Sequence, residues 1–200
     1  MTRAGHEDDA VTALDELIAG VRACRACAGR LPGEPRPVVQ LSGSARLLIA
    51  SQAPGAKVHA SGIPFSDASG DRLREWMGIS PETFYDESQV AILPMGFCYP
   101  GRGAGGDKPP RAECAHLWRS ALLAEMPQIE LTLLVGTYAQ DNVLGSGRMS
   151  DRVRHFDAYL PAYFPLPHPS WRSRIWMRDN AWFEAEVLPE LRRRVKDVLE

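Results

Sequence analysis

The stretch Arg46-Leu47-Leu48-Ile49-Ala50, followed directly by Ser51-Gln52-Ala53-Pro54-Gly55, decides the fold. Its first half is a short apolar run without alternation, which is typical of a strand buried on both faces of a parallel sheet. Its second half is a turn of small residues, which exposes backbone N–H groups and lets a ligand approach closely. In open α/β sheets, ligands bind beyond the carboxyl ends of the strands, so this turn is a candidate binding site.

Further apolar runs extend the predicted sheet at Val90–Leu93, at Leu131–Val135 and, more weakly, at Tyr163–Leu166. Helical patterns lie around them, at Val11–Ala28, Gly70–Met77, Arg111–Met126, Tyr138–Val143 and Ala181–Leu199. The Pro-containing stretch Leu31–Gly43 reads as a connector and the glycine-rich stretch Gly101–Gly106 as a loop. Strands alternating with helices predict an α/β fold, a three-layer α/β/α domain with a central four-stranded, largely parallel sheet. We expect residues 1–200 to form this single domain.

Composition narrows the class of protein. With 200 residues, 44% of them hydrophobic and 24% charged, the chain can bury a core without disulfide bonds. A formal net charge of −2 excludes a general nucleic-acid coat, so any DNA contact must come from a local patch. Met1–Val11 lacks the apolar core of a signal peptide, and no apolar run approaches the ~20 residues that span a bilayer. We therefore expect a soluble, cytoplasmic monomer.

The run from Ser51 to Phe65 resembles the first motif of the uracil-DNA glycosylase superfamily. The resemblance implies that Phe65 stacks on an extruded base, because a flipped base needs a flat apolar surface to replace its lost stacking. Families with an acid inside this motif use it to position a water molecule. Here Gln52 and Ala53 occupy the matching positions; neither can act as a base, and both are expected to line the base pocket.

The next run, Phe65 to Asp71, resembles the broad-specificity, iron–sulfur branch of the superfamily, with one residue missing upstream of the acid. This resemblance implies that Asp67 is the catalytic acid, which positions the water and stabilises positive charge on the sugar. The alternative is that Asp67 or Ser66 caps the helix that follows. His59 is a second candidate for contacting a phosphate or assisting the water.

Pro167-His168-Pro169-Ser170 follows the last predicted strand, and the two prolines restrict the backbone around the histidine. The tripeptide His168 to Ser170 resembles the second motif of the same superfamily. The resemblance implies that His168 hydrogen-bonds the base carbonyl next to the scissile bond, where negative charge develops as the bond breaks. Ser170 is expected to contact DNA.

Family members place a DNA-inserting loop after this motif, and here the corresponding residues are rich in Trp and Arg. An apolar wedge, Trp171 or Ile175, would fill the gap left by the flipped nucleotide. Arg172 and Arg174 would hold phosphates. For each of these residues the alternative is a packing segment with solvated arginines.

The four cysteines of the chain are Cys24, Cys27, Cys98 and Cys114. In a reducing compartment they are expected to bind a metal or cluster sooner than to form disulfides. A thiolate quartet suits a [4Fe–4S] cluster or zinc, and four unconnected buried thiols remain an alternative. The whole spacing, with a Pro-rich loop between the third and fourth cysteines, resembles the cluster-binding glycosylases and implies a structural [4Fe–4S] cluster.

Just before Cys98, strict uracil enzymes carry an Asn that reads the base edge, whereas this chain has Pro94-Met95-Gly96-Phe97. Met95 is expected at the base pocket, with backbone groups taking over the readout. The sequence thus predicts a monofunctional DNA-repair glycosylase that excises uracil from DNA, with other deaminated or damaged bases as further candidate substrates. The alternatives are an inactive module that binds damaged or single-stranded DNA, and a metal-dependent hydrolase of small nucleosides.

Overall fold

Four parallel strands form the central sheet in the order β2-β1-β5-β6. The computed structural model describes residues 12–200, and the predicted acidic start, Met1–Val11, lies outside them. The strands are β1 (Leu47–Ala50), β2 (Val90–Ile92), β5 (Leu131–Val135) and β6 (Tyr163–Leu166). Each predicted run is therefore confirmed to within one residue, and every pairing in the sheet is parallel.

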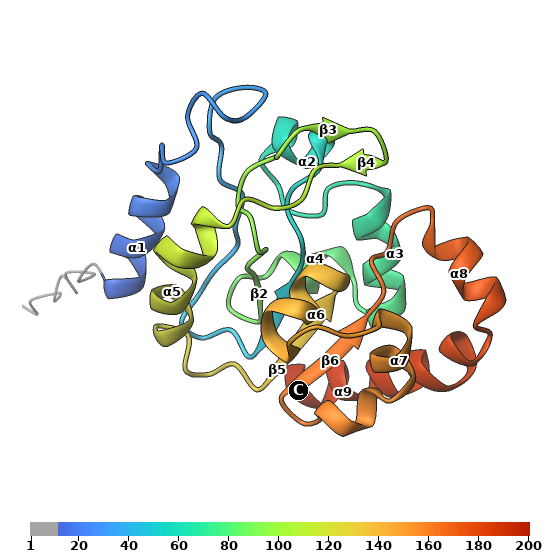
Figure 1. Cartoon of the computed structure of the whole chain (residues 1–200). Helices are drawn as coiled ribbons and strands as arrows, with labels where there is room; N and C mark the ends of the chain where they lie inside the picture. Colours follow the sequence, from blue (N-terminus) through green and yellow to red (C-terminus); the bar gives the residue numbers. More distant parts are fainter. Residues whose placement is uncertain (1–11) are drawn as a thin grey trace, which may run out of the picture.

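Helices cover both faces of this sheet (Figure 1). The α-helices are α1 (Ala13–Arg22), α2 (Ala56–Ser61), α3 (Ala68–Met77), α4 (Pro81–Tyr85), α5 (Ser120–Ala124), α6 (Thr137–Leu144), α7 (Met149–Arg154), α8 (Ser173–Asp179) and α9 (Leu188–Leu199). Two π-helical stretches, η1 (Ala115–Arg119) and η3 (Phe183–Val187), precede α5 and α9, and η2 (Phe156–Tyr159) is a 3₁₀-helix. None of these helices has both the length and the apolar character needed to cross a bilayer.

The alternation of side chains along β1 divides the core into two layers, because successive residues of a strand point to opposite faces. Leu47 and Ile49 pack into the larger core, which is built with residues of α3, α4 and α9. Leu48 packs on the other face with residues of α1 and α5. The three-layer α/β/α architecture predicted from the sequence is confirmed.

Several local predictions differ from the structure. The first helix ends at Arg22, close to the last apolar residue of its stripe, and the chain continues into the turns that carry Cys24 and Cys27. The predicted Gly101–Gly106 loop instead contains a short antiparallel hairpin, β3 (Arg102–Gly103) paired with β4 (Gly106–Asp107). Helices α2, α4, α7 and α8 were not predicted, because they span fewer than about two turns and show no readable period.

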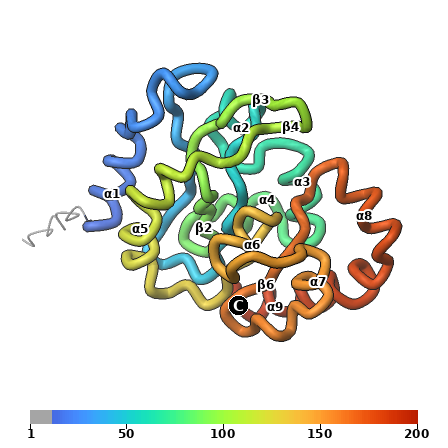
Figure 2. The backbone as a smooth tube through the Cα atoms, viewed as in Figure 1, coloured from blue at the N-terminus to red at the C-terminus, as the bar shows by residue number. Residues whose placement is uncertain are grey.

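Three stretches far apart in the sequence meet at the carboxyl edge of the sheet (Figure 2). They are the turn after β1 with the segment leading into α3, the β3–β4 hairpin, and the loop between β6 and α8. In an open parallel sheet this edge is where ligands bind, so the fold itself directs attention to it.

Candidate active site

A cavity of about 660 Å³ lies between these three stretches. Ligand sites for small molecules commonly span about 300–1,000 Å³, so the cavity is large enough for a nucleobase with its sugar. Residues predicted from the two motifs contribute to its wall: Gln52, Ala53, Phe65, Asp67, His168, Ser170 and Arg172. The structure thus brings together residues that are more than a hundred positions apart in the chain.

The turn after β1 is held by the strand segment next to it. The backbone N–H of Met95 donates to the carbonyl of Ser51 at 2.7 Å, and that of Gly96 donates to the carbonyl of Gln52 at 2.8 Å. Gln52 and Ala53 line the cavity as expected. The Met95 side chain does not: it is 5% exposed and packs with Ala50, Leu134 and Ala139. The expectation that Met95 lines the base pocket is corrected, because its N–H bonds to Ser51 while its side chain fills the core.

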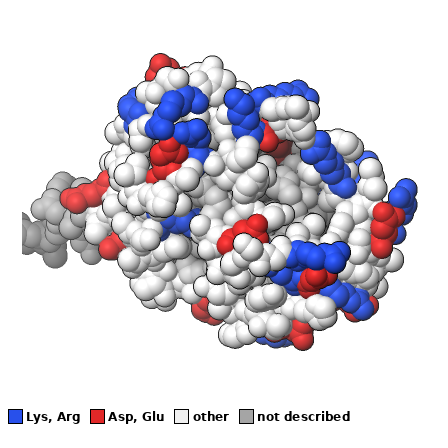
Figure 3. All heavy atoms as spheres, in the orientation of Figure 1, with Lys and Arg blue, Asp and Glu red and all other residues white. Residues whose placement is uncertain are grey.

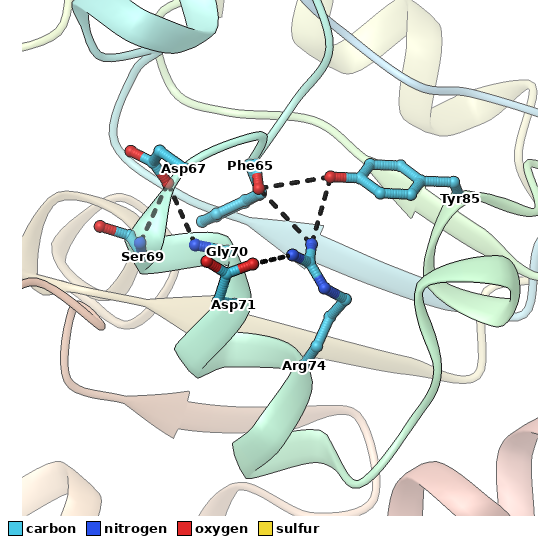
Figure 4. A network of polar contacts seen from close by, with 7 residues as sticks. All are labelled: Phe65, Asp67, Ser69, Gly70, Asp71, Arg74 and Tyr85. Atoms are coloured by element: carbon cyan, nitrogen blue, oxygen red, sulfur yellow. Dashed lines mark hydrogen bonds and ion pairs between the residues drawn. The ribbon is translucent and has the colours of Figure 1, made fainter.

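Phe65 lines the cavity in an unusual backbone conformation. Its φ of 54° is the one positive value among the non-glycine residues at 12–200, and such conformations persist only where neighbours impose them. Its carbonyl accepts a hydrogen bond from the Tyr85 hydroxyl at 3.3 Å and from an Arg74 Nη1 at 3.5 Å (Figure 4). Arg74 is itself paired with Asp71 at 2.5 Å. This network fixes the place of the ring.

Asp67 both caps α3 and faces the cavity. One carboxylate oxygen, Oδ1, accepts from the backbone N–H groups of Ser69 and Gly70 at 3.1 Å each (Figure 4). The capping interpretation is therefore correct, yet Asp67 also lines the cavity. Because the cap uses Oδ1 alone, it orients the carboxylate and leaves Oδ2 without a hydrogen bond to the described residues. The two interpretations of Asp67 do not exclude each other.

His168 lies in the cavity wall against the glycine that starts α6. A Cβ on Gly136, whose φ is +86°, would lie 3.3 Å from the His168 Cβ, so the imidazole packs where only a glycine leaves room. The following loop is fastened from the side by Arg72, whose Nη1 donates to the carbonyls of Pro169 at 3.1 Å and Ser170 at 2.6 Å. Burial lowers the pKa of His168, while the nearby carboxylates of Asp67 and Asp107 act in the opposite direction.

The lowered pKa of His168 gives a pH prediction with a definite sign. An unfolded histidine titrates near pH 6.5, so as the pH falls below about 6.5 the unfolded chain binds the proton before the folded one. Above about pH 6.5, burial of neutral His168 therefore does not lower the free energy of unfolding. That free energy falls as the pH drops through the lowered pKa of folded His168. NMR titration should give a midpoint below 6.5 for His168, with exposed His116 as the reference signal. A midpoint at or above 6.5 would contradict it.

Two predicted residues lie away from the cavity. His59, on α2, does not line it; its Nδ1 is buried without a hydrogen-bond partner among the described residues, and its ring lies 6.1 Å from that of Tyr99. Arg174, on α8, lines a separate groove between α3 and the C-terminal helices, together with Arg72, Arg178 and Arg192.

The loop between β6 and α8 presents apolar and basic side chains beside the cavity mouth. Trp171 in this loop is 67% exposed, and Ile175 in the following helix α8 is 53% exposed. Arg172 Nη2 donates to the carbonyl of Gly105 at 2.6 Å and thereby ties this loop to the β3–β4 hairpin. On the same face, Lys and Arg side chains lie around a hollow, with some Asp and Glu side chains among them (Figure 3).

Sequence reasoning missed three side chains of the cavity: Arg102, Asp107 and Tyr138. Arg102 and Asp107 belong to the hairpin that the sequence suggested as a loop, and they face each other in its register. Tyr138 is 43% exposed in the first turn of α6. The only sequence signal for Arg102 and Asp107 is that they flank a short glycine-rich stretch. Such a pattern does not tell which distant residues the loop contacts.

The four cysteines line one small cavity, which shares no lining residue with the active-site cavity. None forms a disulfide; Cys27, Cys98 and Cys114 are buried and Cys24 is partly buried. The backbone N–H of Phe97 donates to the Cys114 Sγ at 3.3 Å. Burial raises the pKa of the Cys98 and Cys114 thiols to about 11 each. Within residues 12–200, no three His, Cys, Asp or Glu side chains already converge as they would around a single metal ion.

Comparison with known protein families gives one match. The model of a family described as the uracil DNA glycosylase superfamily matches residues 39–192. The matched range contains the whole central sheet, both sequence motifs and every residue of the cavity wall except Val38, and it covers well over half of the chain.

Proposed function

The chain belongs to the uracil DNA glycosylase superfamily, and from that premise we propose that it is a monofunctional DNA-repair glycosylase that excises uracil from DNA. The observation that carries this proposal is the meeting of Phe65, Asp67 and His168 in one cavity. A flipped base needs a stacking surface, a group for the attacking water and a donor for the leaving base. These three residues offer one of each.

The reaction follows from their chemistry. The ring of Phe65 stacks on the extruded base, and neutral His168 donates an N–H to the base carbonyl as the glycosidic bond weakens. The C1′–N bond breaks and its electron pair goes to the base. A water molecule held by Asp67 forms the new C1′–O bond, loses its proton to the carboxylate and then to solvent, and leaves an abasic site. The base anion takes a proton from solvent.

The cavity wall also supports a hydrolytic mechanism and a relaxed choice of base. No lysine lines the cavity in the described part of the chain, so no amine is placed to form a Schiff base with the sugar. Backbone groups take over the readout that strict uracil enzymes assign to an Asn before Cys98, and Gln52 and Ala53 line the same pocket. We infer that other deaminated or damaged bases are accepted besides uracil, by a protein that acts as a cytoplasmic monomer.

The DNA would lie across the cavity mouth. Trp171, which lines the cavity, or Ile175, exposed on α8, would fill the gap left by the flipped nucleotide. Arg172 and Ser170 at the cavity rim, and Arg174 in the adjoining groove, are placed to contact phosphates. This local basic rim explains how an acidic chain could bind a polyanion.

The test of the proposed function is excision of uracil from a labelled single-stranded oligonucleotide, followed by alkaline cleavage of abasic sites. We expect Asp67→Asn to slow single-turnover excision by about 100-fold, because the amide cannot accept the proton of the water. Asn also caps helices well, so α3 and the melting temperature should be preserved. Asp86→Asn, at a turn away from the cavity, serves as the matched control.

Two results would redirect the proposal. If Asp67→Asn excises as fast as wild type, Asp67 acts only as a helix cap. If wild-type protein binds uracil-containing DNA and releases no base, the chain is a damaged-DNA or single-strand binding module on the same fold. The observation that favours this second candidate is the absence of an acid at Gln52 and Ala53, where other members carry one.

We propose that the four cysteines hold a structural [4Fe–4S] cluster. Three observations support the fit: all four line one cavity, none is in a disulfide, and a buried donor nearby lacks a partner. That donor is the indole Nε1 of Trp118, which also lines the cavity and has no hydrogen-bond partner in the described residues. A sulfur-rich group could accept it. A cluster spreads its thiolates over several iron atoms, which suits cysteines that do not converge on one point; zinc remains the alternative.

Metal analysis tests this assignment. Protein purified without oxygen should contain iron and acid-labile sulfide and absorb visible light. Cys114→Ser should lose most of the iron and lower the melting temperature, because binding energy at a structural metal site contributes to folding. Chelation of the wild-type protein should reproduce the same loss. Stoichiometric zinc without sulfide would establish a zinc site. If the protein contains neither iron nor zinc, the four cysteines are free thiols.

A further inference from the structure

The first motif of this chain lacks an acid, yet a carboxylate lies against it in space. Gln52 and Ala53 stand where other members of the superfamily carry the acid, and neither ionises. A Cβ added to Gly55, the last residue of the same turn, would lie 3.6 Å from Oδ2 of Asp107. Asp107 belongs to β4, more than fifty positions further along the chain. The hairpin therefore returns a carboxylate to the turn that lacks one.

The Asp107 carboxylate faces the same cavity as the other reacting groups. Asp107 lines the cavity together with Asp67 and His168. Its negative charge reaches two aromatic neighbours, since it opposes the lowering of the His168 pKa and contributes to the raised pKa of Tyr99, which burial mainly causes. Two carboxylates thus stand around one imidazole, with Asp67 on the α3 side and Asp107 on the hairpin side.

The hairpin holds Asp107 in place through backbone contacts. Asp107 pairs with Arg102 in the hairpin register, and the N–H of Lys108 donates to the carbonyl of Gly101 at 2.8 Å. Arg172 ties the hairpin tip to the loop after His168 through Gly105. Asp107 itself forms no ion pair within the described chain. Arg102, opposite Asp107 in the register, forms no ion pair with it, so the Asp107 carboxylate is open to whatever occupies the cavity.

The negative charge of Asp107 does not favour the binding of DNA. A carboxylate at the mouth of a site for a polyanion repels phosphates, so it weakens binding unless it interacts with a positive charge. Positive charge does appear during the proposed reaction, on the deoxyribose, as the C1′–N bond breaks. A fixed negative group is most favourable where charge of opposite sign develops in the transition state.

We propose that Asp107 is a second catalytic carboxylate, which stabilises the positive charge on the deoxyribose while Asp67 holds the attacking water. This proposal rests on the proposed glycosylase function and divides the work between two acids. Asp67 is rigidly oriented by the α3 cap, as the placement of a water requires. Asp107 forms no bond to the substrate and takes no proton; it acts through its charge.

The first experiment compares single-turnover excision with DNA affinity. Asp107→Asn should excise uracil roughly 100-fold more slowly than wild type, while its affinity for uracil-containing DNA is unchanged or tighter. Asp107→Glu should recover part of the rate, because it restores the charge. Lys108→Gln, on the same hairpin segment, and Asp157→Asn, exposed and outside the cavity, should excise like wild type. A rate for Asp107→Asn within threefold of wild type would overturn the proposal.

A second measurement tests the charge directly and does not depend on turnover. Wild-type protein should bind DNA that carries a cationic pyrrolidine in place of the sugar more tightly than DNA with a neutral tetrahydrofuran, both with free uracil present. Asp107→Asn should lose this preference by about tenfold or more, and Asp157→Asn should keep it. An unchanged preference in Asp107→Asn would refute the role of Asp107. If wild type excises no base at all, the glycosylase proposal fails, and the cation preference alone decides on Asp107.

Discussion

Replacement of His168 by alanine is expected to slow single-turnover excision of uracil by about 100- to 1,000-fold, the effect typical of removing one fixed donor to a developing anion. The His168 side chain packs against Gly136, and the carboxylates of Asp67 and Asp107 act on its pKa, so alanine leaves a gap that no neighbouring donor fills. Water that enters the gap is less well oriented than the imidazole. The affinity for uracil-containing DNA should change far less than the rate, because the donor acts mainly in the transition state.

The measurement needs rate and affinity on the same oligonucleotide. Rates come from single-turnover excision and affinities from fluorescence anisotropy under conditions that prevent turnover. His116→Ala replaces an exposed histidine on η1 and should behave as wild type. If His168→Ala loses affinity and rate in the same proportion, the imidazole contributes uniform binding and not stabilisation of the leaving base.

The second large effect is expected from Gly70→Ala. A Cβ at this position in α3 would lie 1.7 Å from the carbonyl oxygen of Phe65, which is far inside any permitted contact. Alanine favours helices by about 1 kcal/mol over glycine, so helix propensity alone predicts that the variant is more stable. The clash has the opposite sign, and we expect a net loss of about 3 kcal/mol in the free energy of unfolding.

Activity should fall as well. The backbone that the clash would displace belongs to Phe65, whose ring we propose stacks on the base. Denaturant unfolding measures the stability, and the excision assay measures the ring's placement. Gly33→Ala is the matched control, since a Cβ there meets nothing within 4 Å. Stabilisation of Gly70→Ala, with activity retained, would mean that the Phe65 backbone can move without loss.

The sequence predicted the sheet well because its strands are short, mostly apolar runs without alternation. Leu131–Val135 is buried along its whole length, and this pattern survives whatever the strand packs against. Phe65, Asp67 and His168 could be identified because they lie in short motifs whose neighbours, such as the prolines around His168, constrain the backbone. Their positions were predicted from resemblance, and the structure supplies the cavity that joins them.

The residues that could not be predicted depend on non-local packing. Met95 stands in an apolar run that fits a pocket or a core equally well, and only its bond to Ser51 decides which way its side chain points. His59 lies on a helix too short to show a period. Asp107 follows a glycine-rich stretch without any local signal, since its role depends on where the hairpin returns to the first motif.

The cavity of the four cysteines has a consequence for the entropy of the segment that bears the hairpin. Cys98 and Cys114 bracket Tyr99–Glu113 and line the same cavity, so this segment is a loop closed at its base. Closing a loop removes many conformations from the chain before any ligand arrives, and that cost is then absent from the binding step. The hairpin with Arg102 and Asp107 is thereby ordered ahead of the DNA, at the expense of folding free energy and not of affinity.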